Sequence, residues 1–119
     1  MSRDSRVYLN DIIESINQIK IYMKKTSFEK FCKDRKTIDA VIRNLEIIGE
    51  AVKFIPQNIK ARYEYDWRGV VGLRDILIHG YFGINLKLVW DIIKNELPEF
   101  ENQIKEILEK ENFDNHSEQ

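Results

Sequence analysis

Two long stretches of the chain repeat apolar residues at alternating three- and four-residue steps. The first stripe is Leu9, Ile12, Ile16, Ile19 and Met23, and the second is Ile38, Val41, Leu45, Ile48, Val52 and Ile55, which Pro56 stops. Steps of this kind place side chains along one face of an α-helix. Because both stripes follow a repeat of about 3.5 residues, we expect these two helices to pack as a near-antiparallel hairpin.

Cap signals predict shorter helices around this hairpin. Thr26 and Glu29 have capping-box spacing, which predicts a short helix that carries Phe28 and Phe31. Asp66 is a candidate N-cap for a helix that runs to about His79, with Gly80 at its C-terminal end.

Two further helices are expected in the last third of the chain. Asn85 is placed to cap one that carries Leu86, Val89, Trp90 and Ile93, and Pro98 is placed in the first turn of another, whose stripe is Phe100, Ile104 and Ile107. With only two prolines and five glycines, the sequence has few of the turn residues that separate the strands of a sheet. We therefore predict an all-α, up-and-down bundle that forms one domain over residues 1–110, with a polar, disordered tail at residues 111–119.

Apolar residues also occur off the two stripes, at Ile13, Ile21, Ile42 and Ile47. They widen the buried face, either for a thicker core within one chain or for a second copy in a homodimer. The pattern leaves both explanations open.

Composition narrows the class of protein. The 119 residues carry 19 basic and 20 acidic side chains, and a net charge of −1 argues against a protein that coats polyanions generically. The charge is nevertheless uneven, because residues 20–36 hold seven basic side chains against two acidic ones. Such a segment is either a solvated helix face or a surface that guides a polyanion.

Metal and membrane sites are not expected. Two histidines and the single Cys32 cannot supply a four-ligand zinc site or an internal disulfide, so we expect no metal, no cofactor and a reducing cytoplasm. No apolar run approaches the roughly 20 residues of a membrane span.

The candidate chemistry lies in the stretch from Gly72 to Phe82. Asp75 and His79 are four residues apart, so on a helix they share a face and the carboxylate can orient the imidazole. Arg74 is five residues before His79, which is about 140° around a regular helix. The two converge if the helix unwinds at Gly80, or if two copies meet at a symmetry axis. The alternative is structural: His79 caps carbonyls and Arg74 pairs with Asp75.

The segment from Arg74 to Tyr81 reads R-x4-H-x-Y, which resembles the signature of HepT-like toxins in the HEPN superfamily. The resemblance extends to the block from Arg43 to Ala51, to the run from Tyr81 to Ile84, and to the pairs Val89-Trp90 and Leu97-Pro98.

This resemblance implies a HEPN-like helical homodimer that acts as a metal-independent endoribonuclease toxin on an RNA substrate. Its implied partner is a minimal nucleotidyltransferase antitoxin of the MntA type. Carried over, His79 and Arg74 are catalytic, Asp75 orients the histidine, and Tyr81 is the tyrosine that the antitoxin adenylylates. Two other functions remain open: a non-catalytic subunit that binds nucleotide or RNA or recognises the nucleotidyltransferase's substrate, and a purely structural helical dimer.

Overall fold

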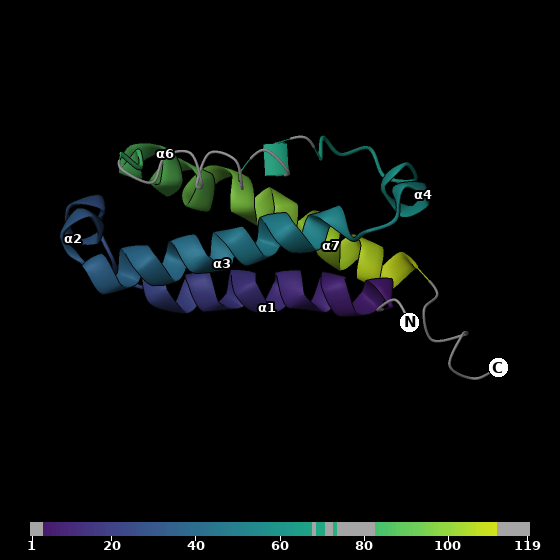
Figure 1. The fold of residues 1–119 in the computed structure, drawn as a ribbon, viewed down its shortest axis with the longest axis horizontal. Helices are drawn as coiled ribbons and strands as arrows, with labels where there is room; N and C mark the ends of the chain where they lie inside the picture. Colours follow the sequence, from purple (N-terminus) through teal and green to yellow (C-terminus); the bar gives the residue numbers. More distant parts are fainter. Residues whose placement is uncertain (1–3, 68, 71–72, 74–82, 112–119) are drawn as a thin grey trace.

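The computed structural model describes residues 4–67, 69–70, 73 and 83–111. Its centre is a hairpin of α1 (Ser5–Met23) and α3 (Arg35–Lys53), which lie side by side and run in opposite directions (Figure 1). Every residue of the two predicted stripes is buried in one core. The predicted antiparallel hairpin is therefore confirmed.

Residues beside the two stripes divide between core and surface. Ile13 and Ile42 are partly buried and pack against the core, whereas Ile21 is 63% exposed. A fully buried Leu or Ile side chain contributes about 1.5–3 kcal/mol, so Ile13 and Ile42 widen a core that the stripes already define. Of the two explanations offered for apolar residues off the stripes, a thicker core within one chain therefore applies to Ile13 and Ile42.

The short helix between the hairpin arms is α2 (Phe28–Lys33), and its cap differs from the predicted one. The hydroxyl of Ser27, not Thr26, accepts a hydrogen bond from the backbone N–H of Lys30 at 3.2 Å. Thr26 instead belongs to the turn that closes α1, because its N–H donates to the carbonyl of Met23 at 3.2 Å. The predicted helix is correct, but its capping residue is Ser27 in place of Thr26, and no capping box forms with Ser27 because the third residue after it is Lys30, which has no side-chain acceptor.

A second short helix, α4 (Gln57–Lys60), was not predicted. It follows Pro56, whose backbone carbonyl accepts bonds from the N–H groups of Ile59 and Lys60 at 3.1 Å. Ile59 is buried in the core. Four residues are too few to show a helical period, so the sequence carried no signal for this element.

The last two predicted helices form one continuous rod. It consists of α6 (Leu86–Asp91), a π-helical turn η1 (Ile92–Glu96) and α7 (Leu97–Lys110). The backbone N–H of Leu97 donates to the carbonyl of Ile92, five residues back. Pro98 has no N–H to donate, and its ring would crowd the carbonyl of residue 94 in a regular α-helix. The wider π turn lets the rod pass this proline, where the sequence predicted a break.

The rod completes the bundle by packing α7 against α1 and α6 against α2 (Figure 1). Phe100, Ile104 and Ile107 are buried in the same core as the hairpin, which confirms the predicted stripe. The described part of the chain is helical and contains no strand. None of the described helices is long and apolar enough to cross a bilayer.

A buried carboxylate ties α7 to α1. Glu101 is only 5% exposed, and both of its oxygens lie within 2.7 Å of the Lys20 ammonium, while Lys105 Nζ lies 3.2 Å from Oε2. Burial alone would raise the pKa of Glu101, but the hydrogen bonds from the two lysines outweigh it and hold the pKa below its usual value of 4.5.

We expect Glu101→Gln to lower the free energy of unfolding by about 2 kcal/mol at neutral pH, because a charge-assisted hydrogen bond is lost in a buried position. Folding lowers the pKa of Glu101, so the stabilisation is complete above about pH 4.5 and disappears as the pH falls through the folded-state pKa. Denaturant unfolding of both proteins at pH 7 and pH 3 measures this difference.

The matched control is Glu109→Gln, which changes the same charge at an exposed position of α7. Its effect should stay within about 0.5 kcal/mol at either pH. A Glu101→Gln effect no larger than this control at pH 7, or one that is no smaller at pH 3 than at pH 7, would contradict the role of the ion pair.

Candidate functional site

The four residues of the predicted motif, Arg74, Asp75, His79 and Tyr81, lie outside the described residues. Their immediate flank is visible: Gly69, Val70 and Leu73 are helical, in agreement with the helix expected after Asp66. Leu73, the residue before Arg74, is 5% exposed and belongs to the core. The chain therefore enters the motif from a helix that is anchored in the bundle.

Three aromatic rings fix the approach to this helix. Tyr65 and Trp67 meet edge to face with ring centroids 5.2 Å apart, and Phe100 of α7 lies 5.7 Å from Tyr65 and 6.0 Å from Trp67. Such pairs each add about 0.5–1.5 kcal/mol beyond the area that they bury. The cluster holds residues 65–67 against α7, so Trp67 acts as a structural anchor.

A second anchor lies just before these rings. The side chain of Glu111, directly after α7, accepts a hydrogen bond from the Tyr63 hydroxyl at 2.7 Å and pairs with Arg62. Burial, the hydrogen bond and the nearby Glu111 charge raise the pKa of Tyr63 to about 12. The phenol therefore stays protonated and donates to Glu111 throughout the ordinary pH range.

Beyond the motif, the described chain resumes at Gly83 and is fixed again within two residues. Asn85 caps α6 as predicted, because its side-chain oxygen accepts from the N–H of Leu88 at 3.1 Å. In α6, Trp90 contacts the rings of Phe28 and Phe31 in α2, with centroids 5.6 and 5.8 Å away. The motif segment is thus bracketed by Leu73 on one side and the capped start of α6 on the other.

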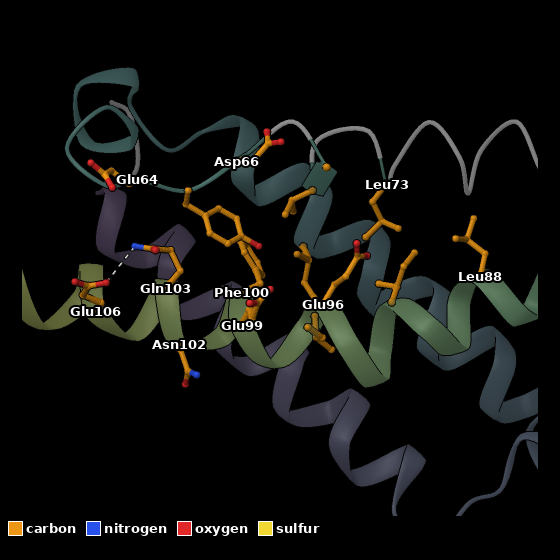
Figure 2. A pocket seen from close by; sticks show the side chains of 16 residues that line it. Glu64, Asp66, Leu73, Leu88, Glu96, Glu99, Phe100, Asn102, Gln103 and Glu106 are labelled. Atoms are coloured by element: carbon orange, nitrogen blue, oxygen red, sulfur yellow. Dashed lines mark hydrogen bonds between the residues drawn. The ribbon is translucent and has the colours of Figure 1, made fainter.

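A groove of about 780 Å³ lies between residues 64–66, 69–70 and 73 on one side and the rod of η1 and α7 on the other (Figure 2). Its apolar lining includes Leu73 from the entering helix, Phe100 from α7 and Ile48 from α3. Five carboxylates share its walls: Glu64, Asp66, Glu96, Glu99 and Glu106. Figure 2 shows the first two opposite the other three.

The electrostatics of the groove follow from these carboxylates. No lysine or arginine is among its described lining residues. Burial, followed by the charges of Glu99, Glu96 and Asp66, raises the pKa of Tyr65. Negative charge of this kind disfavours the approach of a phosphate group. Within the described ranges, no group of His, Cys, Asp or Glu side chains could hold a metal ion.

Sequence reasoning did not find the groove, because its walls come from segments about 30 residues apart along the chain. One signal was present: Glu96, Glu99 and Glu106 are separated by three and seven residues, which places them on one helical face. Their counterparts Glu64 and Asp66 lie outside a regular helix, so no period could reveal them.

Comparison with known proteins gives a consistent result. The family model described as Ribonuclease HepT-like matches residues 12–107. This range covers α3, the rod as far as Ile107, and the stretch in which the motif lies.

Individual relatives extend over most of the chain. A Methanocaldococcus jannaschii protein named "Putative RNase" is 47% identical over 108 residues, which is 90% of this chain and 87% of the relative. A Caldanaerobacter subterraneus subsp. tengcongensis protein of the same designation is 44% identical over 89% of this chain and 96% of the relative. "Probable ribonuclease HepT" of Thermococcus cleftensis is 41% identical over 90% of this chain and 98% of the relative. No solved structure matches the chain.

Proposed function

The chain belongs to the HepT-like ribonuclease family, and from that premise we propose that it is a metal-independent endoribonuclease whose motif is Arg74, Asp75, His79 and Tyr81. The observation that carries the proposal is the R-x4-H-x-Y segment, which falls inside the matched range of residues 12–107. The anchoring of Leu73 and Asn85 on either side supports it, because a catalytic segment needs a rigid frame.

Each motif residue has a chemical role in this proposal. His79 removes the proton from an RNA 2′-hydroxyl, the 2′-oxygen bonds to phosphorus, and the bond from phosphorus to the 5′-oxygen breaks. The protonated His79 then returns this proton to the departing 5′-oxygen, so the histidine ends the step in its starting form. Arg74 binds the phosphate oxygens, and Asp75 orients the imidazole. The products are a 2′,3′-cyclic phosphate and a 5′-hydroxyl end.

The active unit in this proposal is a homodimer. Arg74 and His79 are about 140° apart around a regular helix, so a single helix does not aim both side chains at one phosphate. Two copies related by a two-fold axis place the arginine of one beside the histidine of the other. The cleft between them then holds one phosphodiester.

The biological role in this proposal is that of a cytoplasmic toxin, with a minimal nucleotidyltransferase as its antitoxin. The antitoxin transfers adenylate from a nucleoside triphosphate to the hydroxyl of Tyr81, and pyrophosphate leaves. The modification adds bulk and negative charge two residues from His79, where the RNA phosphate has to dock. Like-charge repulsion and steric exclusion then block the substrate without unfolding the toxin.

We expect Arg74→Ala and His79→Ala each to reduce RNA cleavage at least about 100-fold, because the first removes the cation that stabilises charge on the phosphate and the second removes the acid–base group. Helix content should stay at the wild-type level, and EDTA should leave the wild-type rate unchanged. Gel analysis of a labelled RNA and mass spectrometry of its ends provide the readout. Cleavage that survives His79→Ala, or that stops with EDTA, would overturn the mechanism.

The dimer makes a prediction about mixtures of these inactive variants. If a site joins Arg74 of one chain with His79 of the other, mixed dimers keep one intact site. Half of the dimers in an equal mixture are mixed after subunit exchange, and each keeps one of the two Arg–His pairs, so the mixture should recover between about a quarter and about half of the wild-type activity. A mixture that stays inactive, or a solution mass of a monomer at micromolar concentration, would refute the composite site. RNA binding without any cleavage by the wild type would instead favour the non-catalytic binding subunit.

Protein produced together with its nucleotidyltransferase should carry adenylate on Tyr81 and be inactive. A Tyr81→Phe variant should fold, cleave RNA and escape neutralisation, because it lacks the oxygen that accepts the adenylate. Intact mass and peptide mapping identify the modified residue, and cell growth reports neutralisation. An unmodified Tyr81 in fully neutralised protein would mean that the antitoxin acts by forming a complex.

A further inference from the structure

Figure 1 shows that α1 stops and α3 begins at the same end of the bundle, with α2 between them. The sequence of this end is rich in lysine. Residues 20–36 hold seven basic and two acidic side chains. One of the two acids, Asp34, caps α3: its side chain accepts from the Thr37 N–H at 3.2 Å and from the Thr37 hydroxyl at 2.6 Å. The carboxylate is therefore engaged with the helix start.

Only part of this positive charge is neutralised within the fold. Lys20 pairs with Glu101, and Arg35 pairs with Asp39 at 3.1 Å. Lys24, Lys25, Lys30 and Lys33 are all exposed, and within the described part of the chain none of them forms an ion pair. Four solvent-facing ammonium groups thus remain around one short helix and the turn before it.

The rod adds lysines to the same end of the molecule. Lys94 Nζ lies 4.8 Å from the ring centroid of Trp90, and Lys87 Nζ lies 5.5 Å from that of Phe28. Lys87 also pairs with Asp91 at 3.2 Å, whereas Lys94 forms no ion pair with any described residue. A cation–π contact restrains an ammonium group without cancelling its charge. Lys94 is therefore held in place and still available to an anion.

The backbone of the turn also bears on this surface. Lys25 has a φ of 59°, in the left-handed region that favours glycine. A residue with a Cβ pays roughly 1 kcal/mol there. The turn nevertheless carries Lys25 directly after Lys24, the residue that caps the end of α1, and both lysines are exposed.

These lysines lie near the point where the chain leaves the proposed catalytic segment. The described chain resumes at Gly83, two residues after Tyr81, and α6, which starts at Leu86, packs against α2. On the rod's other half, the groove beside α7 is lined by carboxylates. A polyanion that approaches the motif is therefore attracted by the α2 end and repelled along the groove.

We propose that Lys24, Lys25, Lys30, Lys33 and Lys94, which we call the basic end, bind the phosphate backbone of the single-stranded RNA substrate next to the scissile bond. This inference rests on the proposed ribonuclease function. The lysines contribute affinity and position the strand but do not take part in the chemistry. Because ammonium groups act on phosphates as point charges, the contact is independent of sequence and sensitive to salt.

The test measures RNA binding in a chain that cannot cut its ligand. Lys30→Gln/Lys33→Gln is introduced into His79→Ala, and the dissociation constant for a fluorescent single-stranded RNA is measured between 50 and 300 mM salt. Each phosphate contact on a single strand contributes a slope of about −0.7 in log K against log salt. Loss of two contacts should weaken binding roughly 25-fold at 0.1 M salt and flatten the slope by about 1.4.

The matched control is Lys53→Gln/Lys110→Gln in the same background. It removes the same net charge from exposed positions at the last residues of α3 and α7. Lys53 lies about 27 Å along α3 from its first residue, well beyond a Debye length at this ionic strength. The dissociation constant of the control for RNA should stay within about twofold of that of His79→Ala alone. Both double substitutions should leave the melting temperature of the protein unchanged.

Three outcomes overturn the proposal: unchanged RNA binding by Lys30→Gln/Lys33→Gln, an equal loss in the control, or loss of antitoxin binding while RNA binding persists. The last result would assign the basic end to a protein partner. Failure of the ribonuclease function appears separately, as a wild-type protein that binds RNA through the basic end and does not cleave it.

Discussion

The apolar contact between α1 and α3 is the constraint on which the rest of the molecule depends. Two helices of 19 residues each bury one stripe against the other; α2 packs onto α3, α7 packs onto α1, and α6 in turn packs onto α2. Phe100, Ile104 and Ile107 cover α1, and Ile48 of α3 contributes to the lining of the groove. This contact also fixes the start of the motif segment, because Leu73, the residue before Arg74, is buried in the same core.

The fold also separates charges that nearly cancel in the sequence. A net charge of −1 suggests little electrostatic direction, yet the lysines collect around α2 and the carboxylates collect beside α7. This separation requires the antiparallel hairpin, which sends the basic turn to one end of the bundle. The net charge therefore does not reveal that positive and negative side chains lie in different parts of the molecule.

The sequence predicted the structural features that follow a regular residue spacing, namely the long helices and their buried faces. The stripes of α1, α3 and α7 follow helical periods, and their burial agrees with them. The cap at Ser27 was missed because two adjacent hydroxyl residues compete for one role, and the turn after α1 decides between them. The groove was missed because it joins segments that only the tertiary structure brings together. The motif residues remain a prediction from the sequence, since they lie outside the described part of the chain.

The π turn at Ile92–Glu96 has a consequence for how this chain can vary in length. A π turn holds one residue more than an α turn, so losing a single residue there would restore a regular α-helix. The two halves of the rod would then rotate by about 100° and approach by about 1.5 Å. Lys94 and Trp90 face α2 while Phe100 faces the core, so both faces cannot survive such a change. The one extra residue of the π turn therefore sets the rotation of α6 relative to α7 about the axis of the rod. That rotation determines how the basic end is oriented relative to the acidic groove.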